Sequence, residues 1–155
     1  MKIRPATPDD VHSMMELASA SSSAAHWSSE QYRELFSPDE HSQRLTLVAE
    51  RETSSIPASS LLGFLVARQV APDWELENVV VAPDAQRKGI GKRLLEALFA
   101  AARETNSEAV FLEVRESNTT ARRLYENARF QQQGRRKSYY SNPMEDAILY
   151  RRDLH

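Results

Sequence analysis

The segment from residue 79 to residue 95 constrains the fold most, because it predicts a strand, a short turn and a helix in immediate succession. Three valines end the strand at residues 79–81, a proline and an aspartate then break it, and a helical apolar pattern begins at Ile90. Gly89 and Gly91 lie where the turn enters the helix, and neither carries a side chain that would keep a ligand from the backbone. The sequence therefore predicts an α/β protein with a ligand site at the start of this helix.

Positive charge gathers at the same turn. The free backbone N–H groups in the first turn of a helix point towards a ligand and favour an anion there. The cations beside them are Arg87, Lys88, Lys92 and Arg93. We therefore predict a site for a pyrophosphate. An ordinary helix start with two glycines and surface cations is the alternative interpretation, because short motifs produce false matches.

The spacing of the glycines does not match either of two common phosphate-binding motifs. A P-loop requires G-x-x-x-x-G-K-[ST], and a dinucleotide-binding turn requires G-x-G-x-x-G. The segment Gln86-Arg87-Lys88-Gly89-Ile90-Gly91 has neither pattern. A nucleotide hydrolase and a dehydrogenase are therefore disfavoured.

Composition narrows the class of protein further. A length of 155 residues with 41% hydrophobic and 27% charged residues is typical of one globular domain. The net charge of −2 offers no bulk attraction to nucleic acid. The absence of cysteine removes disulfides, thiolate nucleophiles and cysteine-bound metals, and we predict no metal site. The chain has no apolar run of signal-peptide or membrane-helix length, so we expect a cytoplasmic protein without a membrane partner.

The order of predicted elements is β-α-α-β-β-β-α-β-α-β-β, in one domain that covers residues 1–155. An antiparallel first half that leads into a β-α-β-α unit predicts a mixed, mostly antiparallel sheet with helices on both faces. The predicted strands cover residues 2–4, 45–50, 61–70, 75–81 and 109–114, with a closing pair from 130 onward and over 145–152. The predicted helices start at Thr7, run from Ser28 to about Phe36, and cover 90–103 and 118–128, while 51–60 reads as a hairpin loop.

Two residues beyond the turn are candidates for proton transfer. Glu113 lies within an otherwise apolar strand, where a carboxylate is paired, close to an edge, or functional; an ion pair with Arg115 is the structural alternative. Asn118 is a candidate helix cap, and Tyr125 follows about two turns later on the same helical face. A tyrosine on an amphipathic helix is more often part of the core, so its role stays open on these grounds.

Several of these motifs together resemble one enzyme family. Residues 86–91 resemble the Q/R-x-x-G-x-G/A motif of GNAT N-acetyltransferases. Residues 112–126 resemble the L-E-V-R-x-S-N-x-x-A-x-x-L-Y-E block of the RimI-type protein N-terminal acetyltransferases in that superfamily, and residues 139–147 resemble its Y-Y-x-x-P-x-x-D-A run. Trp27-Ser28 is similar to the end of that branch's P-W-S loop.

The resemblance implies a fold, a co-substrate and a set of roles. It implies a splayed central strand pair and acetyl-CoA as co-substrate, with the pantetheine arm paired to the strand and the pyrophosphate held at the turn. It assigns Glu113 as general base and Tyr125 as general acid, in direct transfer to a protein N-terminal α-amine; in the RimI-type branch the known acceptor is a ribosomal protein that begins with alanine. The cofactor-binding residues that it implies are Val79, Val80, Val81, Arg87, Lys88, Gly89, Ile90, Gly91, Lys92 and Asn118.

The sequence departs from the family pattern at two positions. Arg129 stands where the family has a glycine after the tyrosine helix, so either this residue is strained or the helix ends differently. His26 stands in place of the proline before the tryptophan, in a segment that contributes to the acceptor pocket. Trp27 and Tyr139-Tyr140 either contact the acceptor or belong to the core.

Alternative functions remain open from sequence. The acceptor could be a small-molecule amine, although a cationic amine favours an acidic pocket, and between the second predicted helix and the following strand only the neighbours Asp39-Glu40 stand out. A non-catalytic CoA-binding module would keep the fold without the chemistry. A nucleic-acid-binding domain would need a broad basic face, which the net charge does not provide. Nothing in the sequence distinguishes a monomer from a homodimer.

Overall fold

A computed structural model describes residues 1–21, 25, 27–37, 43–52 and 61–155. Seven strands in the described part form one sheet in the order β1-β2-β3-β4-β5-β7-β6, and every neighbouring pair is antiparallel except β4–β5. This confirms the predicted mixed sheet. The strands are β1 (Lys2–Pro5), β2 (Arg44–Glu50), β3 (Leu61–Val70), β4 (Asp73–Val81), β5 (Ala109–Arg115), β6 (Gln131–Tyr140) and β7 (Glu145–Asp153).

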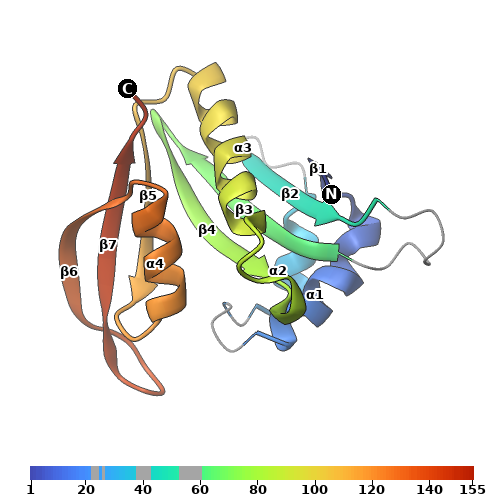
Figure 1. Ribbon diagram of the computed structural model, residues 1–155. Helices are drawn as coiled ribbons and strands as arrows, with labels where there is room; N and C mark the ends of the chain where they lie inside the picture. Colours follow the sequence, from blue (N-terminus) through green and yellow to red (C-terminus); the bar gives the residue numbers. More distant parts are fainter. Residues whose placement is uncertain (22–24, 26, 38–42, 53–60) are drawn as a thin grey trace.

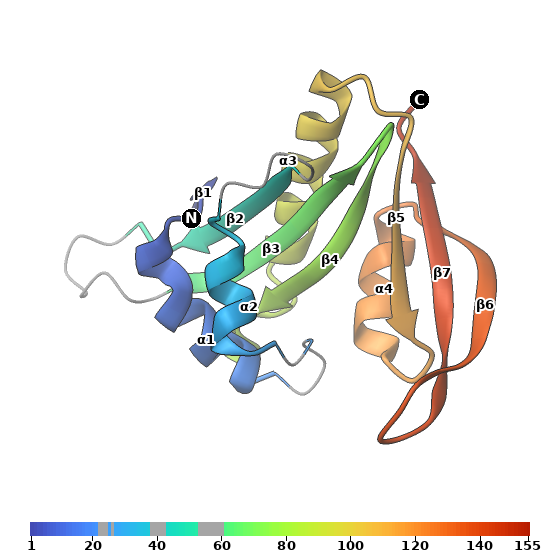
Figure 2. The same cartoon turned by 180° about the vertical axis from the view of Figure 1, so that it is seen from behind.

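The helices cover the two faces of the sheet unequally. They are α1 (Val11–Ser19), α2 (Ser29–Glu34), α3 (Ile90–Glu104) and α4 (Thr119–Asn127), with 3-10 turns η1 (Pro8–Asp10) and η2 (Pro83–Ala85). Helices α3 and α4 lie on one face, and α1 and α2 lie on the other face over the first half of the sheet (Figures 1 and 2). No helix within the described ranges is long and apolar enough to cross a membrane.

Two apolar cores hold these layers together. The larger core lies between the sheet and the α3 side, where Leu94, Leu95 and Leu98 are fully buried. The smaller core lies under α1 and α2 and includes Met14 and Tyr32. The apolar periodicity that predicted the helix over residues 90–103 thus corresponds to the buried face of α3.

A β-bulge in β4 changes which residues face each core. The pairing of β4 with β3 skips one residue, Glu77, between Leu76 and Asn78. Side chains alternate between faces along a regular strand, so Leu76 and Val80 would otherwise lie on the same side. Instead Leu76 belongs to the core on the α3 side, and Val80 belongs to the core under α1 and α2. The bulge therefore resets the orientation of the last residues of β4.

Strands β4 and β5 meet at one end only. They are paired at Trp74–Val110 and at Glu75–Phe111, and no further register pair joins them within the described strands. At that end the Asp73 carboxylate accepts two backbone N–H groups from the start of β5, each at 3.1 Å. Towards the other end the two strands separate, with the start of α3 and helix α4 beside the widening gap (Figure 1). The predicted splayed strand pair is present.

Most predicted elements match the structure to within two residues, and the first helix is the main exception. The segment that follows Thr7 begins as the 3-10 turn η1, and the α-helix starts only at Val11. Asp10 explains the difference, because its carboxylate accepts the Thr7 N–H at 2.7 Å and fixes a tighter first turn. The predicted second helix ends at Glu34 rather than near Phe36. The predicted acid pair at residues 39–40 and most of the loop at 51–60 lie outside the described residues.

Candidate active site

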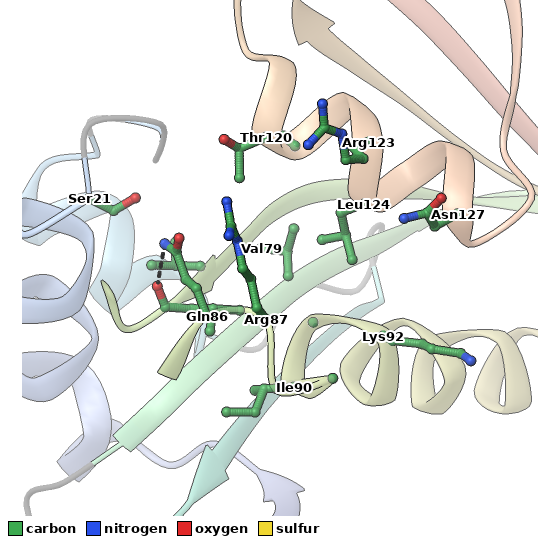
Figure 3. Close-up of a pocket in the computed structure, with 15 residues that line it drawn as sticks. Ser21, Val79, Gln86, Arg87, Ile90, Lys92, Thr120, Arg123, Leu124 and Asn127 are labelled. Atoms are coloured by element: carbon green, nitrogen blue, oxygen red, sulfur yellow. Dashed lines mark hydrogen bonds between the residues drawn. The ribbon is translucent and has the colours of Figure 1, made fainter. Parts of the chain in front are cut away.

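A cavity of about 300 Å³ lies between the end of β4, the start of α3 and helix α4 (Figure 3). Eight of the ten predicted cofactor-binding residues line it, while Lys88 and Asn118 do not. The lining residues are Ser21, Val79, Val80, Val81, Gln86, Arg87, Gly89, Ile90, Gly91, Lys92, Thr120, Ala121, Arg123, Leu124 and Asn127. The cavity thus joins the two halves of the sheet at the end where β4 and β5 are apart.

The turn between β4 and α3 depends on left-handed backbone. Arg87 has φ 66° and Gly89 has φ 81°, and Gly89 is the residue that caps α3. The first helical hydrogen bond of α3 runs from the Arg93 N–H to the Gly89 carbonyl at 3.0 Å. The N–H groups before Arg93 have no acceptor inside the helix, as at every helix start, and all four of their residues line the cavity: Gly89, Ile90, Gly91 and Lys92.

Gly91 has a packing role that sequence reasoning did not foresee. We expected both glycines to give a ligand access to backbone. A Cβ at Gly91 would lie 3.1 Å from Leu124 Cδ2 and 3.6 Å from Val81 Cγ2, whereas a Cβ at Gly89 would meet nothing within 4 Å. Gly91 therefore lets α3 approach α4, and Gly89 supplies the turn its positive φ.

Helix α4 forms a wall of the cavity that sequence analysis did not identify. Its side chains at Thr120, Leu124 and Asn127 are separated by three or four residues, so they share one helical face. Helical spacing was the available signal, but only the family motif was used to choose residues on this helix. Asn118 caps the helix, as the sequence suggested, since its Oδ1 accepts the Ala121 N–H at 3.1 Å, and its contact with the cofactor stays a prediction.

The charge of the cavity favours an anion. Arg87, Lys92 and Arg123 all line it, and Asp and Glu are absent from its described lining. Figure 3 shows Arg87 extending from the turn towards α4, where Thr120 and Arg123 lie. Cations on two walls, together with helix N–H groups, match a phosphate-bearing ligand.

Glu113 lies on β5, beyond the last residue paired with β4. Leu112 and Val114 are buried in the core on the α3 side, so Glu113 projects from the opposite face of the strand. Its Oε1 is 3.3 Å from the Arg136 Nε on β6, and its side chain is 29% exposed. The suggested pairing of Glu113 with Arg115 is wrong, because Arg115 reaches across the β6–β7 hairpin to the carboxylate of Glu145 at 3.3 Å.

Tyr125 is held in an aromatic cluster on the other face. It is 7% exposed, and its ring centroid lies 5.7 Å from that of Phe130 and 6.3 Å from that of Tyr150. Burial raises the pKa of Tyr125 well above its ordinary value, and the nearby Tyr140 adds to this effect. The phenol therefore keeps its proton at neutral pH and can act as a donor.

The β6–β7 hairpin places two tyrosines near Glu113. Tyr139 is 50% exposed, and the charge and hydrogen bonding of Glu113 raise its pKa. Tyr140 is half-buried, with the Arg115 guanidinium 4.3 Å from its ring centroid. Trp27 instead packs against Tyr32 of α2, with ring centroids 5.5 Å apart. Of the suggested acceptor contacts, Tyr139 is thus the exposed one, and Trp27 rests against the smaller core.

Arg129 adopts the backbone conformation of the glycine that it replaces. Its φ is 70°, and the helix ends in a Schellman motif, with hydrogen bonds of 3.0 Å from the Arg129 N–H to the Glu126 carbonyl and from the Phe130 N–H to the Tyr125 carbonyl. The expected strain is therefore present, while the helix end keeps the geometry that a glycine would give.

The splayed parallel pair, the glycine turn and the cavity between α3 and α4 define a CoA-type acyltransferase architecture. The model of the acetyltransferase (GNAT) family matches residues 11–130, and the chain belongs to this family. Among similar proteins, the [ribosomal protein bS18]-alanine N-acetyltransferase of Escherichia coli strain K12 is 36% identical over 91 residues, which cover 57% of this chain and 62% of that protein. The N-alpha-acetyltransferase RimI of Mycobacterium tuberculosis is 41% identical over 81 residues, covering 52% of this chain and 49% of that protein. The matched region thus spans less than two thirds of these relatives.

Solved structures extend the likeness over nearly the whole chain. The crystal structure of the ribosomal-protein-S18-alanine N-acetyltransferase from Escherichia coli has a TM-score of 0.77 at 25% identity, covering 99% of this chain and 93% of that one. Arabidopsis thaliana NAA60 in complex with acetyl-CoA has a TM-score of 0.83 at 16% identity, covering 98% and 97%. The second likeness shows the fold alone.

Proposed function

We propose that the protein transfers the acetyl group of acetyl-CoA to the N-terminal α-amine of a protein acceptor, with an alanine N-terminus of a ribosomal protein as the first candidate. The observation that carries the proposal is the cavity beside the splayed strands, which is lined by cations and by the residues that open α3. Membership of the GNAT family and the names of the relatives support the same reaction and acceptor.

The cavity residues suit the parts of acetyl-CoA. The cations Arg87, Lys92 and Arg123, together with the N–H groups that open α3, suit its phosphates. Val79, Val80 and Val81 end a strand with no neighbour on its β5 side in the described pairing, so the pantetheine arm can pair there as an added strand. The family motif also implies Lys88 and Asn118 as cofactor contacts, and these two residues do not line the cavity.

Glu113 and Tyr125 supply the two proton transfers of direct acetylation. Glu113 removes a proton from the acceptor ammonium, directly or through a water, which frees the nitrogen lone pair. The nitrogen forms the new bond to the thioester carbonyl carbon, and a backbone N–H near Val80 donates to the oxyanion. The carbon–sulfur bond then breaks, and Tyr125 gives its proton to the departing thiolate.

The decisive experiment compares two classes of amine in otherwise matched peptides. One set has free N-termini that begin with Ala, Ser, Thr or Met and contains no lysine. The other set is blocked at the N-terminus and carries one internal lysine. Each set is incubated with the purified protein and acetyl-CoA, and acetylation is read as a mass shift.

Acetylation of the free N-termini alone, fastest for alanine, is the expected result. Modification of neither set, while acetyl-CoA still binds, would overturn the peptide function and direct attention to small amines.

A further inference from the structure

The proposed base forms an ion pair with a cation that neither the family motif nor the mechanism uses. Arg136 lies on β6, and its Nε approaches Glu113 Oε1 at 3.3 Å across the intervening strand β7. Arg136 pairs in register with Ala147 of β7, whose small side chain leaves room for this crossing. The ring of Tyr139 lies 5.3 Å from the Arg136 guanidinium and adds a second, weaker contact.

The face of the sheet that carries this pair is open. Helix α4 lies on the opposite face of β5–β7, and α1 and α2 lie over the first half of the sheet, so no helix of the described chain covers Glu113 (Figure 2). Arg136 is 55% exposed and Glu113 is 29% exposed, so an acceptor from solvent can reach the pair. An amine that approaches Glu113 from this side must also approach Arg136.

We infer that Arg136 makes the acceptor site selective for weakly basic amines, such as a protein α-amine, over lysine side chains and polyamines. The inference rests on the proposed function and extends it from a reaction to the choice of acceptor. Arg136 acts through the charge of Glu113 and through repulsion of the incoming cation, so it is a specificity-determining residue and not a catalytic one.

The physical reason lies in the basicity of the two kinds of amine. An α-amine has a pKa of about 7.7–8.0, and a lysine side chain has a pKa of about 10.4. Near pH 7.5 a substantial share of α-amines is neutral, whereas only about one lysine in a thousand is neutral. A fixed guanidinium beside Glu113 offsets the attraction of the carboxylate for ammonium ions. It therefore penalises the acceptor that arrives charged more than the acceptor that arrives neutral.

The other charged and titratable groups near Glu113 leave this balance in place. The charge on Glu113 raises the pKa of Tyr139, and burial followed by the charge on Glu113 raises the pKa of Tyr140, so both phenols are neutral at physiological pH. Arg115 is engaged with Glu145 at 3.3 Å. Glu75 influences Tyr139 from β4 but pairs with Arg68 at 3.2 Å. Among the ion pairs of the described residues, Arg136 is the partner of Glu113.

The test measures kcat and KM for two peptides with the wild-type protein and four variants. One peptide begins with a free alanine and lacks lysine, and the other is N-terminally blocked and has one lysine. Arg136→Gln and Arg136→Met remove the charge, Arg136→Lys keeps it, and Lys137→Gln removes the neighbouring exposed cation of β6 as a matched control. The melting temperature and the affinity for acetyl-CoA are measured for each variant. Because two uncharged variants are used, a folding defect in one of them leaves the other to test the inference.

We expect kcat/KM for the lysine peptide to rise about tenfold in Arg136→Gln and Arg136→Met, mainly through a lower KM. Arg136→Lys and Lys137→Gln should keep the wild-type preference. If both uncharged variants kept the wild-type preference between the two peptides, or lost activity on the alanine peptide without a gain on the lysine peptide, the inference would be overturned while the proposed function would stand. If the wild type acetylates neither peptide, the proposed function fails and the inference fails with it.

Discussion

Glu113 and Tyr125 occupy contrasting surroundings on the two faces of β5. Glu113 is partly exposed, and its Oε1 lies 3.3 Å from the Arg136 Nε. Tyr125 lies in a buried aromatic cluster, and this burial raises its pKa, so the phenol remains protonated. In the described register β5 has no β4 neighbour beyond Phe111, so its edge is unpaired on that side at Glu113. One residue is thus prepared to take a proton and the other to give one.

Removing either proton-transfer group should lower turnover without removing acetyl-CoA binding. Glu113→Gln and Tyr125→Phe each keep the shape of the side chain, and we expect kcat to fall by about 10²–10⁴-fold in each case. Stopped-time mass assays with an alanine peptide give kcat, and calorimetry gives the affinity for acetyl-CoA. Loss of cofactor affinity in parallel with kcat would show that the residue is structural.

The Arg4–Asp10 pair makes the start of the chain sensitive to acid. Arg4 donates to both Asp10 oxygens at 2.9 and 3.0 Å, and these hydrogen bonds, with the Thr7 N–H, lower the pKa of Asp10 below its ordinary 3.8. A carboxyl with a lowered folded pKa stabilises the fold above its unfolded pKa, and this contribution disappears as pH falls below 3.8. Asp10→Asn should therefore cost about 1–3 kcal/mol of unfolding free energy at pH 7 and flatten its dependence on acid. Urea unfolding between pH 7 and pH 3 measures the loss of unfolding free energy and its dependence on pH. If Asp10→Asn lost stability with falling pH as the wild type does, Asp10 would not be the source of the acid sensitivity.

The residues of the turn and the two proton-transfer candidates could be predicted from sequence, because each lies in a short local motif. The partner of Glu113 could not. Arg136 reaches it only through the register of β5 with β7 and of β7 with β6, which no local pattern encodes. The nearby Arg115 seemed the natural partner on chain distance, but the hairpin offers it Glu145 and the Pro143 carbonyl instead.

At the scale of elements, the end of α4 carries strain that a single substitution can remove. Arg129 has φ 70°, a conformation that favours glycine. Its charge also lies near Arg152: burial lowers the pKa of Arg152, and the charges of Arg103 and Arg129 lower it further. Arg129→Gly should raise the unfolding free energy by about 0.5–1 kcal/mol. Arg129→Ala removes the charge but keeps the strain, so it should gain less. Denaturant unfolding of both variants measures the two changes in unfolding free energy. Equal increases in Arg129→Gly and Arg129→Ala would assign the effect to charge alone.

The contact between α3 and α4 should set the width of the cavity. A Cβ at Gly91 would lie 3.1 Å from Leu124 Cδ2, so Gly91→Ala must displace that side chain or move the helices apart. We expect acetyl-CoA affinity to fall about three- to tenfold, equivalent to about 1 kcal/mol. Leu124→Val combined with Gly91→Ala should recover part of the loss, because the shorter side chain leaves room. A double variant no better than Gly91→Ala would show that the cost lies in the helix backbone.

Element order, most boundaries and the mixed sheet could be read from apolar periodicity and turn residues. Two features of β4 could not. The bulge at Glu77 leaves an apolar strand pattern on both sides of it, so only the pairing with β3 reveals it. The cavity wall on α4 was missed for another reason. Thr120, Arg123 and Asn127 are polar residues at helical spacing, a pattern that is typical of any solvated helix face.

At the scale of the whole molecule, the chain consists of two halves joined at one end of β4. The connections to the second half come from the start of β4, at Asp73, Trp74 and Glu75. Trp74 Nε1 donates a hydrogen bond to Thr105 Oγ1 at 3.0 Å, and the Asp73 carboxylate accepts two backbone N–H groups. The cavity lies at the other end and takes residues from both halves. A ligand in it would therefore contact both halves where their strands are apart.

Acetyl-CoA should consequently stabilise both halves together. At a concentration of about 100 times Kd, a ligand that binds only the folded state raises the unfolding free energy by about 2.7 kcal/mol. Hydrogen exchange should slow both in the segment from Val79 to Arg93 and in α4, which line opposite sides of the cavity. Exchange in β1, remote from the cavity in sheet order, serves as the internal reference. Protection of the turn without protection of α4 would mean that the ligand touches only the first half, and that the second half joins the site only when the acceptor binds.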